Sequence, residues 1–189
     1  MPGDETTLAY FDTTIATSAS PADAFRYLAD FSNAAEWDPN VLRAVRLDDG
    51  PVAEGARFRV ELSLGRRTIP ILYTLESCER DRLLVFRADE PWFRSVDTIE
   101  LTPRSGGTQI HYDADLRLEG MAFLFDPLVH LGFQFSGQRS ADGLRRRLDA
   151  LPPSHAHSPS GPRLVSDEDG AEGASSVQSP QREVGPKSI

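Results

Sequence analysis

Several features that would narrow the function of this chain of 189 residues are scarce or missing. Its single cysteine, Cys78, excludes a disulfide within the chain and favours a reducing compartment. The N-terminal residues lack the basic and apolar regions of a secretory signal peptide. The most apolar window, residues 121–135, contains Asp126, Pro127 and His130 and is too short to cross a bilayer. We therefore expect a cytoplasmic protein without stable membrane insertion.

Positive charge is also scarce. The formal net charge is −9, and Lys187 is the single lysine among 20 basic residues. Nucleic acids and anionic membranes are bound through basic surfaces, so this balance disfavours both as partners. A small molecule or another protein remains as the expected partner.

Motifs that would identify an enzyme directly are absent. We find no glycine-rich phosphate loop, no H-E-x-x-H, no G-x-S-x-G and no C-x-x-C. Two of the four histidines, His155 and His157, lie near the C-terminus, where an isolated pair is a weak metal signal. We therefore expect no metal and no cofactor. Any chemistry must come from residues that the fold brings together.

The composition changes after Leu151. Residues 152–189 consist largely of Pro, Ser, Gly, Gln, Asp and Glu and contain no aromatic residue. Such a segment cannot bury enough apolar surface to offset the entropy lost on ordering. We predict one folded domain over residues 1–151 and a disordered tail over 152–189.

The predicted domain is α+β, in the order strand, two short helices, six strands and one long helix. The first strand covers 8–18, and Ser20-Pro21 begins a helix that is followed by a shorter one over 32–37. Short turns and period-2 alternation predict an antiparallel meander of seven strands with one buried face, and such a sheet curls. The six later strands are predicted at 41–47, 56–64, 68–78, 82–88, 93–101 and 108–118.

The final helix is predicted from Asp126 to Leu151, between the start signal Asp126-Pro127 and the stop signal Pro152-Pro153. Its apolar C-terminal half should anchor it on the sheet. The N-terminal half of the same stripe is polar or small, which favours a roof over a cavity; the alternative is that these polar side chains reach solvent. The stripe reads His130, Gln134, Gly137, Ala141, Leu144, Leu148 and Leu151.

Two segments carry a family resemblance. Residues 19–33, ASPADAFRYLADFSN, with Glu36-Trp37-Asp38-Pro39, resemble the opening of the START-like or SRPBCC superfamily. The strand at 96–101, the turn Gly106-Gly107-Thr108 and the long final helix resemble its polyketide cyclase/dehydrase and lipid-transport branch. Over residues 8–151 the resemblance implies a helix-grip fold, in which a cavity lies between a curved sheet and the C-terminal helix. It transfers no catalytic role.

The candidate site residues are polar or aromatic side chains on the presumed inner surface. Asp97 falls in register with apolar neighbours, so it should be paired, for example with an arginine, or functional. His130 titrates near neutral pH, and with Asp97 it is a candidate general acid or base. His111 falls on the polar face of its strand and should meet solvent. The predicted ligand-binding residues are Phe58, Tyr73, Trp92, Asp97, Tyr112, His130 and Gln134.

Three functions are compatible with these residues. The first is binding of a hydrophobic small molecule, such as a lipid, isoprenoid or polyketide, by a carrier or sensor. The second is an aromatase or cyclase that uses acid–base groups in the same cavity. The third is a protein-interaction module in which the cavity has collapsed and the acidic surface or tail makes the contacts.

Overall fold

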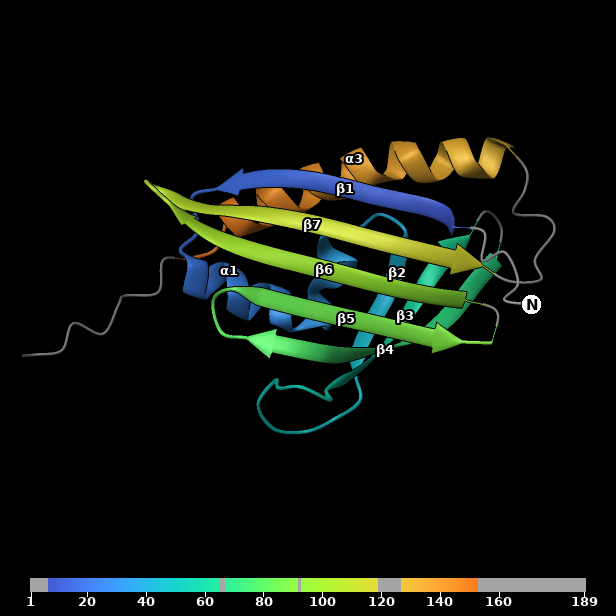
Figure 1. Ribbon diagram of the computed structural model, residues 1–189, viewed down its shortest axis with the longest axis horizontal. Coiled ribbons are helices and arrows are strands. Elements are labelled where there is room, and N and C mark those ends of the chain that lie inside the picture. Colours follow the sequence, from blue (N-terminus) through green and yellow to red (C-terminus); the bar gives the residue numbers. More distant parts are fainter. Residues whose placement is uncertain (1–6, 65–66, 92, 119–126, 153–189) are drawn as a thin grey trace, which may run out of the picture. The chain divides into compact units, whose positions relative to one another are not determined.

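The computed structural model describes residues 7–64, 67–91, 93–118 and 127–152, and the predicted order of elements is confirmed (Figure 1). Observed boundaries differ from the predicted ones by up to three residues. The predicted tail, apart from Pro152, lies outside the described residues. The elements are β1 (Thr7–Thr17), α1 (Pro21–Ala29), the 3-10 helix η1 (Phe31–Asn33), α2 (Ala34–Trp37), β2 (Val41–Arg46), β3 (Arg57–Leu64), β4 (Arg67–Glu79), β5 (Leu83–Glu90), β6 (Phe93–Arg104), β7 (Gly107–Leu118) and α3 (Pro127–Asp149).

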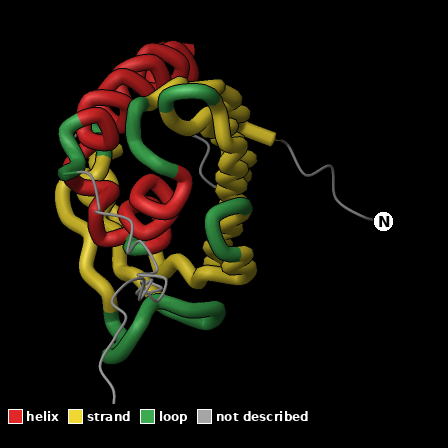
Figure 2. Tube along the Cα trace, turned by 90° about the vertical axis from the view of Figure 1, so that its left-hand side faces the viewer, coloured by secondary structure: helices red, strands yellow, loops and turns green. Residues whose placement is uncertain are grey.

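The seven strands form one antiparallel sheet in the order β1-β7-β6-β5-β4-β3-β2. Strands β2 to β7 form the predicted meander, and β1 joins it by pairing with β7, so that Ile15 lies opposite Ile110. A register shift between Leu75 and Ser77 interrupts the pairing of β4 with β5, and such irregularities bend a sheet. The sheet curves, and the helices lie on its inner side (Figure 2).

The inner face carries the core because buried residues alternate along the strands. Ile110, Tyr112 and Ala114 of β7 are buried, as the alternation predicted, and the same holds for Ile71, Tyr73 and Leu75 of β4. Phe31 of η1 stacks on Phe86 of β5, with ring centroids 4.3 Å apart. The short helices therefore pack against the inner face of the sheet.

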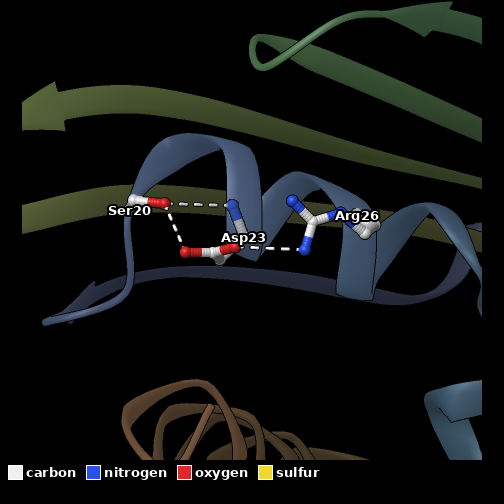
Figure 3. A network of polar contacts seen from close by, with 3 residues as sticks. All are labelled: Ser20, Asp23 and Arg26. Atoms are coloured by element: carbon white, nitrogen blue, oxygen red, sulfur yellow. Dashed lines mark hydrogen bonds and ion pairs between the residues drawn. The ribbon is translucent and has the colours of Figure 1, made fainter. Parts of the chain in front are cut away.

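The predicted start of α1 is confirmed in detail (Figure 3). The Ser20 hydroxyl accepts a hydrogen bond from the backbone N–H of Asp23 and donates one to the carboxylate of Asp23. Arg26, one turn further, donates to the same carboxylate. This reciprocal arrangement satisfies a backbone donor that the first helical turn would leave without a partner.

The last two turns of α3 hold the helix against β1 and α2. Leu144 and Leu148 are each 1% exposed, and a Cβ at Gly143 would approach the Trp37 carbonyl oxygen to 2.2 Å. Only a glycine permits this contact between α3 and α2. At the end of α3, Asp149 accepts hydrogen bonds from the Thr17 side chain and from the backbone of Ser18.

Gly137 has a packing role that the sequence stripe did not reveal. A Cβ at this position would lie 2.2 Å from the ring of Phe11 on β1. The small residue therefore admits an aromatic ring between β1 and α3, and it is no evidence for a roof over a cavity. The helical backbone places His130 and Gln134 on α3, but their side chains lie outside the described residues.

Candidate functional site

A carboxylate lies on the apolar inner face of β6. Strand alternation directs Phe93, Ser95, Asp97, Ile99 and Leu101 inward, and Asp97 is 5% exposed. Burying a charged carboxylate costs several kcal/mol unless partners compensate for the lost water. The neighbours of Asp97 therefore determine its state.

The partners of Asp97 are hydroxyl groups. Ser95 donates to Oδ1 of Asp97, and Tyr112 on the neighbouring strand β7 donates to Oδ2 at 2.7 Å. The structure shows no arginine at this carboxylate within the part of the chain that it describes, contrary to the pairing suggested from the sequence. Asp97 is thus hydrogen-bonded without a neutralising charge.

This environment raises the pKa of Asp97 from 3.8 to about 6. Burial is the largest cause, because it disfavours the charged form. The hydrogen bonds from Ser95 and Tyr112 lower the pKa, and the charges of Asp38 and Asp113 raise it further. A carboxyl group of this kind changes protonation state just below neutral pH.

Tyr73 of β4 lies on the same inner face as this network. It lies opposite Ala88 of β5, which in turn lies opposite Ser95 of β6. Burial outweighs the effect of Ser95, which lowers the pKa of Tyr73. Burial, followed by the charge of Asp97, raises the pKa of Tyr73 and of Tyr112 well above the usual value. Both phenols stay protonated and can donate.

A second acid, Asp38, approaches the site from the connection between α2 and β2. Its Oδ1 accepts hydrogen bonds from the backbone of Asn40 at 2.8 Å and from Ser140 of α3 at 3.1 Å. Burial raises its pKa, while these hydrogen bonds lower it. The charge of Asp38 also raises the pKa of Asp97, Tyr73 and Tyr112. The negative charges of Asp38 and Asp97 therefore raise the pKa values of the same buried tyrosines.

Aromatic rings surround the Tyr112 end of the network. Phe11 of β1 and Trp37 of α2 contact the Tyr112 ring edge-on, with centroids 5.9 Å and 6.0 Å away. Such contacts fix the ring that carries the donor hydroxyl. The geometry provides an apolar, aromatic wall with a localised polar group, an arrangement typical of small-molecule sites.

The structure brings together three of the predicted site residues: Tyr73, Asp97 and Tyr112. Phe58 is fully buried on the same face and contacts the rings of Phe31 and Phe86. Trp92 and the side chains of His130 and Gln134 lie outside the described residues, so their assignments remain predictions.

Sequence reasoning missed three polar residues of this region. Asp38 directly follows the helix predicted over 32–37, and its hydrogen bonds with Asn40 agree with an end of the helix at this point. Ser95 was visible as an inward polar residue two positions before Asp97, which was the available signal. Ser140 adjoins the apolar stripe of α3, but no local pattern links it to Asp38.

The opposite face of β7 carries a different polar cluster. His111 is 39% exposed, as expected from its register, and its Nε2 lies 3.2 Å from Oδ2 of Asp12. Among the described residues, no group of His, Cys, Asp and Glu could hold a metal ion. None of the helices described here is long and apolar enough to cross a membrane.

The sheet, the elbow formed by α1 and α2, and the helix α3 define a START-like helix-grip fold. Residues 9–149 match the model of the family described as polyketide cyclase / dehydrase and lipid transport, and the chain belongs to this family. No curated protein matches the chain.

Solved structures with low sequence identity share the fold. A START superfamily protein from Mycobacterium smegmatis is 13% identical, with a TM-score of 0.60 over 74% of this chain and 97% of that one. The Zhui aromatase/cyclase from Streptomyces sp. R1128 is 14% identical, with a TM-score of 0.58 over 75% of this chain and 93% of that one. A protein from Thermus thermophilus is 18% identical, with a TM-score of 0.61 over 74% of this chain and 97% of that one. At these identities the similarity concerns the fold.

Proposed function

We propose that the chain binds a largely apolar small molecule between the inner face of the sheet and α3. The observation that carries this proposal is the buried Asp97, which is held by two hydroxyls on an otherwise apolar face. A side chain that only filled the core would avoid this desolvation cost. In a binding site the same network orients the polar end of a ligand, while the aromatic rings contact its apolar body.

The first test is native mass spectrometry of the freshly purified full chain, followed by organic extraction. A defined added mass that disappears on extraction supports a carrier or sensor. A clean mass, together with no thermal shift across lipids and aromatic polyketides, contradicts ligand binding and favours the protein-interaction module.

A pair of matched substitutions tests the location of the ligand. Ala114 lies opposite Asp97 on the inner face, whereas Ala16 of β1 is exposed. Ala114→Leu should abolish binding of the extracted ligand, and Ala16→Leu should leave it unchanged. If the interior is packed solid, Ala114→Leu will instead destabilise the fold by about 1–3 kcal/mol, the usual cost of overpacking. A thermal melt separates these outcomes.

The pKa of about 6 at Asp97 favours a second candidate, an enzyme of the aromatase or cyclase class. A buried acid that titrates near neutral pH, beside a phenol that stays protonated, suits general acid–base catalysis. With the extracted molecule as substrate, Asp97→Asn should then abolish turnover while a neutral ligand still binds. Full turnover by Asp97→Asn would exclude this role.

A further inference from the structure

The charge distribution of the interior restricts what the ligand can be. In the described part of the chain, the inner face of strands β3 to β7 carries no basic side chain. Six arginines of these strands occupy exposed positions: Arg57, Arg59, Arg67, Arg87, Arg94 and Arg104. Arg117 of β7 is half-buried, lies in register with the exposed Arg94 and pairs with Asp115 at 3.1 Å. Arg46, at the inward end of β2, is held in the β2–β3 loop by the carbonyl oxygens of Gly50 and Pro51. Asp97 thus lacks a cationic partner, although it is buried.

The hydrogen-bonding capacity of Asp97 also restricts what the ligand can be. An ionised carboxylate offers about four acceptor positions, and the hydroxyls of Ser95 and Tyr112 occupy one on each oxygen. A ligand with N–H or O–H groups finds acceptors there. A ligand carboxylate would bring only acceptors, beside a group that already attracts two donors.

Electrostatics adds a preference among donors. Asp38 and Asp97 both act on this interior, and Asp113 adds a negative contribution from the opposite face of β7. The phenols of Tyr73 and Tyr112 remain uncharged. Since a buried carboxylate has already lost its water, a cation placed beside it restores an attractive interaction that an anion would reverse.

The side chains next to the carboxylate include several small ones. Its neighbours in register on β5 and β7 are Phe86 and Ala114, and the next inward row contains Ala88, Ser95 and Leu116. Small side chains therefore flank Asp97 on two sides. The Trp37 and Phe11 rings lie near Tyr112, and the face of such a ring can bind an ammonium group by cation–π attraction.

We propose that the ligand carries a basic amine at the end that lies against Asp97 and that the site discriminates against the corresponding carboxylic acid. The inference rests on the proposed function, because it assigns the chemical class of the molecule bound in the same interior. It orders three head groups on one apolar body: amine first, alcohol second and carboxylate last.

Three naphthalene probes test this order: 1-naphthylmethylamine, 1-naphthalenemethanol and 1-naphthoate. Their affinities for the full chain are measured by calorimetry at about pH 7.5, where the amine and the naphthoate are charged. We expect the amine to bind at least about tenfold more tightly than the carboxylate, with the alcohol between them. Equal affinities, or a preference for the carboxylate, would overturn the inference while leaving the proposed function intact.

The net charge of −9 favours any cation, so a charge-matched control is required. Asp97→Asn and Asp49→Asn each remove one negative charge, the latter from an exposed loop. We expect Asp97→Asn to reduce the amine-to-alcohol preference by about fivefold or more, and Asp49→Asn to preserve it. A preference that survives in Asp97→Asn would contradict the role of this carboxylate.

A measurement on the unmodified chain covers the case in which Asp97→Asn does not fold. Lowering the pH from about 7.5 to about 5 protonates Asp97 but leaves the amine charged, so the amine-to-alcohol ratio should fall. A ratio that stays constant over this range would overturn the inference. If none of the three probes binds at either pH, the proposed function fails with it, an outcome distinct from equal affinities.

Discussion

Carboxylates on the two faces of the sheet differ in their partners and in their exposure to solvent. On the outer face, acids lie beside cations in exposed pairs: Glu76 with Arg87 at 2.9 Å and Asp89 with Arg94 at 3.1 Å. On the inner face, Asp97 has hydroxyl partners and almost no exposure. The outer pairs are screened by water and contribute little to stability. The inner carboxylate is energetically costly, and a costly buried group points to a function.

The comparison also separates two uses of tyrosine. Tyr10 of β1 is 62% exposed, whereas Tyr112 is 7% exposed and donates to Asp97. The residue type and the strand setting are the same, so burial accounts for the difference. Such matched pairs across the sheet allow each inner residue to be tested against an outer control.

The largest expected effect concerns packing. Leu84 of β5 is fully buried, whereas Leu72 of β4 is 38% exposed on the outer face. Leu84→Ala should lower the free energy of unfolding by about 2–5 kcal/mol, because it leaves a cavity in the core. Leu72→Ala should cost less than about 1 kcal/mol. Urea denaturation of both variants checks the difference, and equal losses would show that the inner face is not the core.

Replacing the buried acid Asp97 should raise the free energy of unfolding, by a smaller amount than Leu84→Ala lowers it. Because the folded-state pKa of Asp97 is raised above its unfolded value, the folded state binds a proton more tightly between about pH 4 and pH 6. Stability from this group is therefore present at low pH and is lost as the pH rises through about 6. Asp97→Asn removes the charge and should stabilise the chain at neutral pH by about 1–3 kcal/mol.

Unfolding of Asp97→Asn and wild type at several pH values checks this sign. The stability gained by Asp97→Asn should shrink below about pH 5, and Asp49→Asn should stay within about 0.5 kcal/mol of wild type throughout. A loss of stability in Asp97→Asn at neutral pH would mean that the charged network supports the fold. Retention of a destabilising acid, in contrast, agrees with the trade-off common at functional sites.

The sequence predicted the inner positions of Asp97, Tyr112 and Tyr73 because period-2 alternation in a meander decides which face each residue occupies. It could not predict their partners. An arginine near Asp97 was a reasonable expectation, but the described arginines of β3 to β6 point outward. The bond from Ser140 to Asp38 joins residues 102 positions apart and depends on how α3 crosses α2. Local patterns carry no information about such a crossing.

The Tyr112 hydroxyl should contribute less to the free energy of unfolding than the Leu84 side chain, but more than an exposed hydroxyl such as that of Tyr10. Tyr112→Phe removes a donor from the charged carboxylate and should cost about 1–2 kcal/mol at neutral pH. The cost should decrease below about pH 5, where Asp97 is protonated. Tyr10→Phe should leave the stability essentially unchanged, because this side chain is exposed. Thermal melts at two pH values check both variants, and a pH-independent cost would argue against a charged acceptor.

The smallest expected effect belongs to the outer ion pairs. Glu76 and Arg87 lie across β4 and β5, and both side chains are about half exposed. Glu76→Gln keeps the shape of the side chain and removes the charge, so the loss should stay below about 0.5 kcal/mol and should disappear in high salt. Denaturation at low and high ionic strength measures it. A salt-independent loss above about 1 kcal/mol would show that an exposed carboxylate on the outer face stabilises the fold substantially, contrary to this expectation.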